Sequence, residues 1–429
     1  MKIHFMGIGG SGISAVARIA KAQGFEVSGC DLEDSAITRK LRTEGIEVII
    51  GHNASHLKNI DILAHSPAVY YQSENHPEFT KAKNPMTWEK FMAKYLMKGK
   101  TLIAVSGTHG KGTTTAMMAR VLEAAKCDPT VEVGANLLDW GKENFRSGKS
   151  KYYLCEADEF REKFLLYKPY VAIITSVEMD HPEYFKNFDA VLNAFVKFSK
   201  KSDILVLNSE DAGCNKLLKE LKGLKTPRII RYKSLRKSQA KLKFPGKHIR
   251  SDAGAVWAAA RVLGVKDKVI KSGLENFNGL ERRFEYRGET ASGIKIYDDY
   301  AHHPTAVSVN INAIREKHPN KKIWAVFQPH MFSRLATLFD DFASSLQLAD
   351  RIIISDVFTR REQGITKPSG KDLSRAVGPK ATYIGGDLVN VANFLSRNAG
   401  KNDILLVMGA GDIYKVSDMI LTSGSKSIS

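Results

Sequence analysis

The stretch TLIAVSGTHGKGTT, residues 101–114, decides the fold class of this chain. Its first five residues are apolar or β-branched and predict a buried strand, whereas the segment that begins at Lys111 predicts a helix. The glycine-rich turn between them would let backbone N–H groups wrap the phosphates of a nucleotide, with Lys111 neutralising their charge and a following threonine hydroxyl reaching Mg²⁺. A strand, a phosphate loop and a helix in this order indicate a parallel α/β sheet.

This loop is shorter than the common pattern G-x-x-x-x-G-K-[S/T], and Gly112 separates the lysine from the first threonine. The alternative interpretation is an ordinary glycine turn beside a solvated lysine. We favour the nucleotide interpretation because the loop lies between a clear strand and a clear helix. The residues expected to bind the nucleotide here are Gly107, Thr108, His109, Gly110, Lys111, Gly112 and Thr113.

A second glycine loop, Gly7-Ile8-Gly9-Gly10-Ser11-Gly12, lies near the start of the chain. It follows an expected strand over 3–7 and opens an expected helix over 11–23, which is the context that a phosphate cradle requires. Its spacing differs from the dinucleotide pattern G-x-G-x-x-G, so a turn that only packs helix on strand is the alternative. A ribose-binding carboxylate often ends the next strand, which here places Asp31 at the same site.

The alternation of strands and helices breaks twice, near 98–100 and near 278–280. In a chain of 429 residues these breaks indicate three α/β domains. We expect a Rossmann-like domain over 1–98, a central phosphate-loop domain over 99–280 and a Rossmann-like C-terminal domain over 281–429. The strands expected in the central domain are 102–105, 152–155, 171–177, 204–208 and 228–232.

Acidic residues follow two of the central strands, at Glu156-Ala157-Asp158-Glu159 and at Glu178-Met179-Asp180-His181. Parallel strands bring their carboxyl ends to one edge of the sheet, beside the phosphate loop. Carboxylates and an imidazole at that edge are suitable ligands for a nucleotide-bound Mg²⁺. The alternative is ordinary capping of the helices that follow.

Polar runs also follow the expected strands of the third domain, at the usual ligand edge of an open α/β sheet. Each could be a solvated loop, but four such runs in one domain favour a binding site. They are Asp298-Asp299-Tyr300-Ala301-His302-His303-Pro304, Gln328-Pro329-His330 with Arg334, Arg360-Arg361-Glu362, and Gly409-Ala410-Gly411-Asp412.

Composition narrows the class of protein. Hydrophobic residues make up 43% of the chain, which indicates a globular protein, and no apolar run reaches the length of a membrane span. The four cysteines form no C-x-x-C pair, and the first residues do not read as a signal peptide, so we expect a cytoplasmic protein. The net charge of +18 raises the possibility of nucleic-acid binding. The densest basic run, 228–250, is nearly free of aromatic residues, which argues for a solvated surface instead.

Taken in order, these motifs resemble the Mur ligase family over nearly the whole chain. Single motifs are weak, whereas the ordered set on three α/β domains is highly specific. The motifs that carry the resemblance are Gly7-Ile8-Gly9-Gly10-Ser11-Gly12, Gly107-Thr108-His109-Gly110-Lys111, Glu156-Ala157-Asp158-Glu159, Asp180-His181, Arg282-Arg283-Phe284, Asp299-Tyr300-Ala301-His302-His303-Pro304, Phe327-Gln328-Pro329-His330 and Met408-Gly409-Ala410-Gly411-Asp412.

The resemblance implies an ATP-dependent ligase of peptidoglycan precursor synthesis, most like the branch that adds L-alanine to UDP-N-acetylmuramate. ATP would phosphorylate the lactyl carboxylate, and the amine of L-alanine would attack the acyl phosphate and release phosphate. The first domain would hold the UDP-sugar and the central domain MgATP. The third domain would close over both and admit the amino acid. We expect a monomer or weak homodimer that binds neither nucleic acid nor membrane.

The resemblance also assigns roles to individual residues. It implies catalytic roles for Lys111, Glu156, His181, His303 and Arg334, and metal ligands at Thr113, Glu156 and His181. It adds His248, Arg283 and Asp299 to the ATP site. It implies UDP-sugar or amino-acid contacts at Gly7, Gly9, Gly10, Ser11, Gly12, Asp31, Ser66, Tyr300 and His303.

Some positions depart from the family pattern. The stretch Gly246–Asp252 lacks both asparagines of the usual adenine-contacting motif, because Ile249 and Asp252 replace them, so we expect altered base recognition. Only Arg334 remains of three arginines that relatives carry after the Gln-Pro-His segment. Three alternatives stay open: a recycling ligase that joins UDP-N-acetylmuramate to a ready-made tripeptide, a catalytically inactive regulator that senses UDP-sugars, and a nucleic-acid-dependent ATPase.

Overall fold

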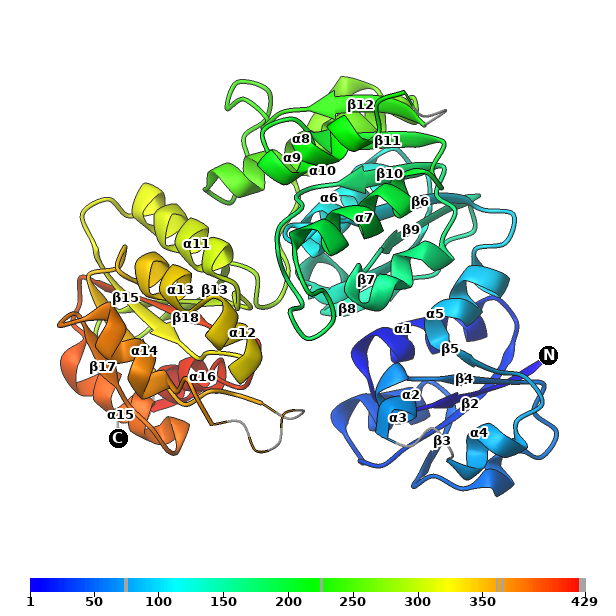
Figure 1. The fold of residues 1–429 in the computed structure, drawn as a ribbon, viewed down its shortest axis with the longest axis horizontal. Helices are drawn as coiled ribbons and strands as arrows, with labels where there is room; N and C mark the ends of the chain where they lie inside the picture. Colours follow the sequence, from blue (N-terminus) through cyan, green and yellow to red (C-terminus); the bar gives the residue numbers. More distant parts are fainter. Residues whose placement is uncertain (73–75, 224–226, 360–361, 363, 365, 424–429) are drawn as a thin grey trace.

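Three separate β-sheets, one after another along the chain, organise the protein (Figure 1). The computed structural model describes residues 1–72, 76–223, 227–359, 362, 364 and 366–423. Each sheet is mainly parallel and carries helices on its faces, which confirms the predicted three-domain α/β fold. No helix in the described part of the chain is long and apolar enough to cross a membrane.

The first sheet has five parallel strands in the order β3-β2-β1-β4-β5. Side chains alternate between the two faces of a strand, so Ile3 and Phe5 of β1 face one helical layer while His4 and Met6 face the other. Its elements are β1 (Lys2–Met6), α1 (Ser11–Ala22), β2 (Glu26–Asp31), α2 (Ala36–Thr43), β3 (Glu47–Ile50), the 3₁₀ helix Ala54–Leu57, β4 (Ile62–His65), α3 (Pro67–Gln72), α4 (Pro77–Lys81) and β5 (Pro85–Thr87).

The second sheet has seven strands in the order β12-β11-β10-β6-β9-β7-β8, and β6 lies between β10 and β9. Only β7 and β8 pair antiparallel, and neither strand was predicted from the sequence. Its elements are β6 (Thr101–Ser106), α6 (Lys111–Ala124), β7 (Thr130–Leu137), β8 (Glu143–Arg146), β9 (Tyr152–Glu156), β10 (Val171–Ile174), α7 (Phe188–Ser199), β11 (Ile204–Asn208), α8 (Ala212–Glu220), β12 (Arg228–Tyr232), α9 (Lys247–Val262) and α10 (Asp267–Glu275), with 3₁₀ turns at Leu138–Trp140 and Phe160–Leu166.

The third sheet has six strands in the order β13-β14-β18-β15-β16-β17, and β13 alone is antiparallel to its neighbour. Separate apolar clusters cover its two faces. Its elements are β13 (Glu285–Glu289), β14 (Lys295–Asp299), α11 (Pro304–Lys317), β15 (Lys322–Phe327), α12 (Phe332–Thr337), α13 (Phe339–Leu346), β16 (Arg351–Ile354), α14 (Gly370–Val377), β17 (Ala381–Tyr383), α15 (Leu388–Asn398), β18 (Asp403–Met408) and α16 (Lys415–Ser423).

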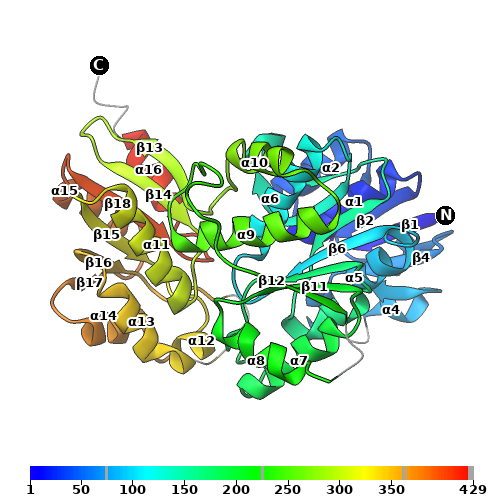
Figure 2. The ribbon, with the colours of Figure 1, turned by 90° about the horizontal axis from the view of Figure 1, so that it is seen from above.

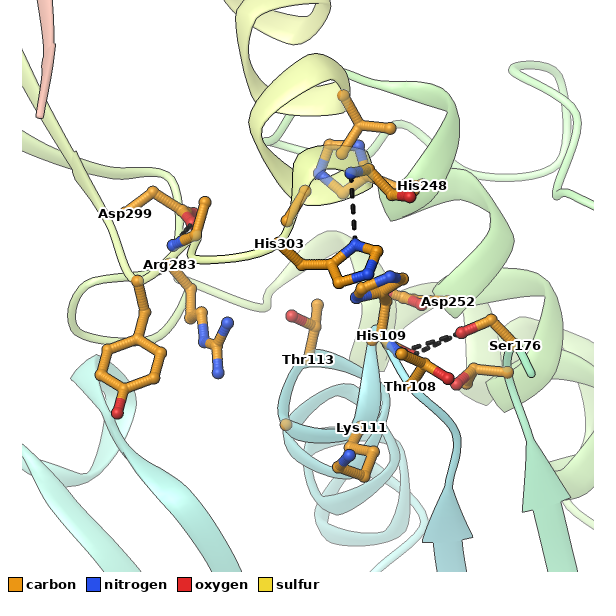
Figure 3. A pocket seen from close by; sticks show the side chains of 18 of the residues that line it. Thr108, His109, Lys111, Thr113, Ser176, His248, Asp252, Arg283, Asp299 and His303 are labelled. Carbon is orange, nitrogen blue, oxygen red and sulfur yellow. Dashed lines mark hydrogen bonds between the residues drawn. The ribbon is translucent and has the colours of Figure 1, made fainter. Parts of the chain in front are cut away.

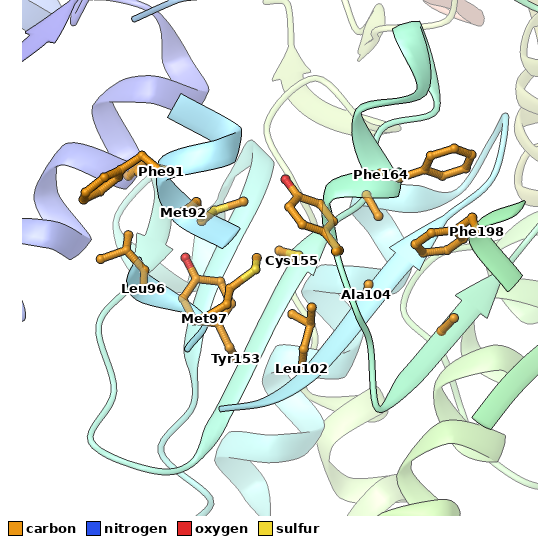
Figure 4. Close-up of a cluster of buried hydrophobic side chains, with 14 of the residues drawn as sticks. Phe91, Met92, Leu96, Met97, Leu102, Ala104, Tyr153, Cys155, Phe164 and Phe198 are labelled. Atoms are coloured by element: carbon orange, nitrogen blue, oxygen red, sulfur yellow. The ribbon is translucent and has the colours of Figure 1, made fainter. Parts of the chain in front are cut away.

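The junctions between neighbouring units differ in chemistry. The first two sheets share one hydrophobic cluster, continued through α5 (Trp88–Phe91) and a π-helical turn over Met92–Leu96. Figure 4 shows Phe91, Met92 and Leu96 on one side of this cluster and side chains of β6 and β9 on the other. The third unit instead meets the second through loops with polar side chains and through contacts between α11 and α9 (Figure 2).

Candidate active site

The phosphate loop joins the end of β6 to the start of α6, as the sequence predicts. Gly107 has φ +136°, and a Cβ there would lie 2.1 Å from the Thr175 hydroxyl oxygen, so no larger residue fits. The segment that follows the neighbouring strand β10 holds the loop in place, because Ser176 Oγ accepts the His109 N–H at 2.9 Å and the Ser176 carbonyl accepts the Thr108 N–H at 3.0 Å (Figure 3). The loop is therefore held rigidly at the carboxyl edge of the sheet.

Lys111 lies at the start of α6 and folds back over the loop. Its ammonium donates to the Gly107 carbonyl at 2.8 Å and to both carboxylate oxygens of Glu159, at 2.8 and 3.0 Å. Burial alone would lower the pKa of Lys111, but the carboxylates of Glu159 and Asp158 outweigh it and raise the pKa. The lysine is therefore a half-buried, charged and pre-oriented cation. The sequence pointed to the acidic run but not to this ion pair.

Glu156 ends β9 beside the same loop. Its Oε1 accepts the Gly134 N–H at 2.6 Å, and a Cβ on Gly112 would lie 3.1 Å from the same oxygen. The close approach of this carboxylate gives a physical reason for a glycine, rather than serine or threonine, directly after Lys111. Burial raises the pKa of Glu156, although the Gly134 N–H and the Lys111 charge act against it.

His181 belongs to a different acidic group from the one predicted. One ligand atom from each of Asp158, Glu159 and His181 lies within 4.8 Å of the others, whereas Glu156 joins no such group among the described residues. The His181 ring lies 4.7 Å from the Phe160 ring, and its Nδ1 lies 3.1 Å from Glu183 Oε1. Burial lowers the pKa of His181, but Glu183 and Asp180 outweigh it and raise the pKa.

These acidic side chains fit a hard divalent cation. Glu156, Asp158 and Glu159 supply carboxylate oxygens, the ligands that Mg²⁺ prefers, at the edge where a nucleotide phosphate would lie. Glu156 makes its hydrogen bond to a backbone N–H and no salt bridge in the described part of the chain. A buried carboxylate without a cationic partner is a suitable ligand for a metal ion.

The third unit packs against these second-unit loops. His303 caps α11 by accepting the Thr305 N–H at Nδ1, and its Nε2 lies 3.3 Å from the Met179 carbonyl oxygen. The Thr305 hydroxyl donates to Glu178 Oε2 at 2.8 Å. Burial lowers the pKa of His303 to about 4, with His109 adding to the effect, so the ring is neutral at pH 7. With both ring nitrogens engaged, His303 bridges the two units.

Arg334 reaches the same junction from α12. Its Nη2 and Nε donate to Asp180 Oδ1 at 2.9 and 3.2 Å, and the two side chains are only 3% and 9% exposed. Burial would raise the pKa of Asp180, but the Arg334 charge outweighs it and holds the pKa well below its usual range. This buried ion pair links residues 154 positions apart and belongs to two different units.

A cavity of about 530 Å³ lies between the second and third units. Its lining includes Phe244 and Phe277, whose ring centroids are 5.8 Å apart, and neither was predicted. Gly107 and Arg334 are absent from the lining but contact residues in it. The predicted residues that line the cavity are Thr108, His109, Gly110, Lys111, Gly112, Thr113, Glu156, His181, His248, Arg283, Asp299, Tyr300 and His303 (Figure 3).

The third-unit residues at this cavity have distinct surroundings. Arg283 lies over the Tyr300 ring at 5.0 Å from its centroid. Asp299 accepts the Phe284 and Ala301 N–H groups, each at 2.7 Å, and so holds its own loop in place. These contacts leave the Arg283 guanidinium, rather than the Asp299 carboxylate, free to meet a ligand phosphate.

The base-recognition stretch is helical in the structure, since α9 begins at Lys247. Ile249 is buried in the apolar core and also lines the cavity. Asp252 turns to the phosphate loop, where a Cβ on Gly110 would lie 2.4 Å from its Oδ1. Burial raises the pKa of Asp252 well above its usual range. The geometry places Asp252 beside the phosphate loop and Ile249 on the cavity wall, and the altered base recognition expected from these two replacements stays a prediction.

The first glycine loop lies in a separate place, outside this cavity. Asp31 fixes that loop, because its Oδ2 accepts the Gly9 N–H at 2.8 Å. The Ser66 N–H donates to the Met6 carbonyl, and a Cβ on Gly7 would lie 3.0 Å from the Ser66 Cβ. The remaining predicted residues of this loop are Gly10, Ser11 and Gly12; Gly10 and Ser11 are exposed.

The unpredicted hairpin β7–β8 links the two sites. Asn144 donates from its side-chain amide to the Ser11 carbonyl at 3.1 Å and lies 3.2 Å from the Ser11 hydroxyl. The same hairpin supplies the Gly134 N–H that binds Glu156. Arg360 and Arg361, which the sequence analysis associated with the third-domain site, lie outside the described residues.

Three family models match successive parts of this chain. The model described as the Mur ligase family, catalytic domain, matches residues 2–98, the Mur ligase middle domain matches 105–254, and the Mur ligase, glutamate ligase domain, matches 282–411. The UDP-N-acetylmuramate–L-alanine ligase of Clostridium novyi is 36% identical to this chain, over 98% of this chain and 97% of that protein. The enzyme of the same name from Caldicellulosiruptor bescii is 37% identical, over 98% of each.

Solved structures agree with these sequence relatives. The crystal structure of the UDP-N-acetylmuramate–alanine ligase of Thermotoga maritima has a TM-score of 0.80 with 29% identity and full coverage of both chains. A murein peptide ligase of Psychrobacter arcticus, at 21% identity and a TM-score of 0.70, shares the fold. The matching models, the relatives and the phosphate-loop geometry together show that this chain belongs to the Mur ligase family.

Proposed function

We propose that this protein is an ATP-dependent ligase that joins L-alanine to the lactyl carboxylate of UDP-N-acetylmuramate in peptidoglycan precursor synthesis. One observation carries the proposal: a rigid phosphate loop with a half-buried Lys111 faces carboxylates and third-unit residues across one cavity. The relatives named for this reaction at 36–38% identity support the choice of substrates. Because the proposed reaction consumes ATP and a UDP-sugar, we propose a cytoplasmic location as well.

The proposed reaction divides between the three units. The unit over 1–98 would hold the UDP-sugar at the first glycine loop, with Asp31 keeping that loop in shape. The unit over 99–280 would hold ATP, and the unit over 281–429 would close the cavity and admit the amino acid. The β7–β8 hairpin contacts both the first loop and Glu156, which supports a path from the UDP-sugar to the phosphate loop.

Lys111 would stabilise the γ-phosphoryl group as it transfers to the lactyl carboxylate. The Gly107 carbonyl already orients the ammonium towards the loop, and binding of a phosphate would exchange one of its hydrogen bonds to Glu159 for one to the phosphate. The Phe244 and Phe277 rings form an apolar wall suited to a purine, and Arg283 supplies a positive charge for the phosphates. A bound metal ion would add further positive charge at the reacting centre.

Thr113, Glu156 and His181 are the residues that we propose to hold Mg²⁺, with Asp158 and Glu159 beside His181. When bound, the ion would offset charge on the phosphoryl oxygens and on the substrate carboxylate. His303 and Arg334 would position the third unit, because their side chains bridge to Met179 and Asp180. Tyr300, which stacks with Arg283, would face the amino acid.

The proposal is tested by mass spectrometry of the product formed from UDP-N-acetylmuramate, MgATP and an equimolar mixture of amino acids. The expected product carries one alanine, and phosphate release requires both the UDP-sugar and an amino acid. A parallel reaction with the L-alanyl-γ-D-glutamyl-diaminopimelate tripeptide tests the recycling alternative. Faster turnover with the tripeptide than with free L-alanine would refute the proposal, as would phosphate release that needs neither substrate.

A further inference from the structure

A second group of metal-ligand side chains lies far from the phosphate loop, in the first unit. Five of the 12 histidines of the chain fall in the first 98 residues: His4, His52, His56, His65 and His76. His4 faces away from the main apolar core because Ile3 and Phe5, its neighbours in β1, face into it. The opposite face of the sheet carries a smaller apolar cluster that includes Cys30 of β2.

Cys30 is the centre of this group, because it belongs to two triads of ligand atoms that each lie within 4.8 Å. One triad consists of Cys30, His52 and Glu78, and the other consists of His4, Cys30 and His56. Cys30 Sγ lies 3.1 Å from His52 Nδ1 and 3.6 Å from Glu78 Oε2. His56 Nδ1 lies 3.4 Å from Glu78 Oε1.

These spacings match those between the ligands of a tetrahedral zinc ion. With Zn–S of about 2.3 Å and Zn–N or Zn–O of about 2.0–2.2 Å, neighbouring ligand atoms are roughly 3.3–3.6 Å apart. The observed separations of 3.1, 3.4 and 3.6 Å bracket that range. The Cys30, His52 and Glu78 atoms lie close enough to share one ion, whereas His56 belongs to the neighbouring triad and would have to turn towards it from its place beside Glu78.

Two buried nitrogens of the group have no hydrogen-bond partner in the described part of the chain: His4 Nε2 and His56 Nδ1. His4 is 1% exposed, and its other nitrogen, Nδ1, lies 2.9 Å from the Ser28 hydroxyl. An imidazole that is oriented through one nitrogen and bare at the other is the usual arrangement of a metal-binding histidine.

Charge gives an independent argument. Glu78 is fully buried, and among the described residues its only salt-bridge partner is His56. A buried carboxylate is costly without a cation. A divalent ion that binds the Glu78 carboxylate and the Cys30 thiolate, with two neutral imidazoles, leaves the site with no net charge. Binding would release the Cys30 thiol proton to solvent as the metal–sulfur bond forms.

We propose that Cys30, His52, His56 and Glu78 form a structural site for a borderline-soft divalent cation such as Zn²⁺, with His4 beside it. The chemistry of one sulfur, two nitrogens and one oxygen favours Zn²⁺ over Mg²⁺. The Cys30 carbonyl accepts the N–H groups of Gly7 and Ile8, at 2.8 and 3.1 Å. The ion would therefore stiffen the strand end that holds the first glycine loop.

The test is titration of the metal-free full-length protein with Co²⁺ in excess Mg²⁺, followed by absorption spectroscopy. Co²⁺ reports thiolate ligation through a sulfur-to-metal charge-transfer band, which the oxygen-rich phosphate-loop site cannot produce. We expect one equivalent of Co²⁺ to give this band and Zn²⁺, which binds more tightly, to abolish it. Cys30→Ser should lose the band. Cys214→Ser, a change of another buried cysteine that joins no group of metal-ligand atoms among the described residues, should keep it.

His52→Gln is a second test variant in case Cys30→Ser does not fold. We expect it to fold because His52 is only partly buried. This variant should bind Co²⁺ at least tenfold more weakly, and Zn²⁺ should raise the Tm of wild type more than that of the variant. Absence of the band in wild type would overturn the proposal. So would a band that survives Cys30→Ser, or unchanged Co²⁺ affinity in His52→Gln. Loss of ligase activity plays no part in these readouts, so the outcome is independent of the proposed reaction.

Discussion

Asp180→Asn should open the junction between the second and third units. The substitution removes the only negative charge that Arg334 pairs with in the described residues, while the shape of the side chain is kept. In the closed protein the guanidinium would then be a buried cation, only 3% exposed, facing a neutral amide. In the open state, water would hydrate the Arg334 guanidinium. The substitution should therefore destabilise the closed state and leave the free energy of the open state nearly unchanged.

The size of the effect follows from the burial of both partners. Removing one partner of a buried ion pair costs about 3–5 kcal/mol. Since each 1.36 kcal/mol is tenfold, the ratio of closed to open molecules should fall by roughly 150- to 5,000-fold. The contacts of Thr305 with Glu178 and of His303 with Met179 remain, and they set how open the variant becomes.

The assay is small-angle X-ray scattering together with steady-state kinetics. We expect a larger radius of gyration for Asp180→Asn and a lower kcat/KM, with a nearly unchanged unfolding transition of the separate units. Asp350→Asn is the matched control, because its partner Arg315, 2.7 Å away, belongs to the same unit. It should leave both the scattering and the kinetics unchanged.

Two results would refute this reasoning. One is a scattering curve for Asp180→Asn that superimposes on wild type in the absence of substrates, with kcat/KM within about threefold. The other is an equal change in the Asp350→Asn control, because any loss of an Asp–Arg pair would then have the same effect. The first would mean that apolar contacts hold the units together. The second would mean that the position of the pair between the units is irrelevant.

Three further predictions follow from the cavity. Lys111→Ala should lower kcat by more than about a hundredfold. It should also destabilise the protein, because Glu159, 2% exposed, loses its cation. Adding Glu159→Gln should restore the Tm but not the kcat, and recovery of both would contradict the assigned role. Glu156→Gln should raise the Mg²⁺ concentration needed for half-maximal activity, since an amide is a poorer ligand for a hard cation; an unchanged Mg²⁺ curve would exclude it as a ligand. The pKa of Glu178 is lowered from 4.5 to about 2, because the contacts with His109 and Thr305 outweigh the effect of burial. The Glu178 carboxylate therefore stabilises the fold fully above pH 4.5, and this stabilisation is lost as the pH falls towards 2. The difference in unfolding free energy between wild type and Glu178→Gln should shrink over that range, and a constant difference would show that the charge is not involved.

Much of the fold could be predicted because it depends on local patterns. Buried strands such as β10 and β11 are continuous apolar runs, and the phosphate loop lies between an obvious strand and helix. The hairpin β7–β8 could not be predicted in this way. Its pairing is antiparallel at the sheet edge, interrupted between Glu132 and Leu137, and its sequence includes Gly134 and Asn136. Edge strands lack the apolar signal of central ones.

The site was predicted in its residue types but not in its pairings. Glu156, His181 and His303 were predicted to lie near Lys111 because they follow the ends of strands, and all four line one cavity. It could not say that Lys111 would pair with Glu159, because neighbours in an acidic run point in different directions. Two carboxylates in this run, Glu156 and Glu159, reach different sides of the loop.

Long-range pairs need the tertiary fold. Arg334 and Asp180 are 154 residues apart, and nothing in either local sequence identifies the other as its partner. The same holds for Asp252, whose place in an adenine motif suggested contact with the base. Because Asp252 lies inside helix α9, its carboxylate instead faces Gly110 of the phosphate loop.

The apolar core shared by the first two sheets has a consequence for cooperativity. Separating those sheets would expose side chains such as Phe91, Met92 and Tyr153, which are fully buried, at a cost of about 25 cal/mol for each Å². The junction of the second and third units is more polar, because charges and hydroxyls line much of it and Phe244 is a smaller apolar contact with the third-unit core. We therefore expect calorimetry to resolve two melting units rather than three, with opening that admits a substrate concentrated at the more polar junction.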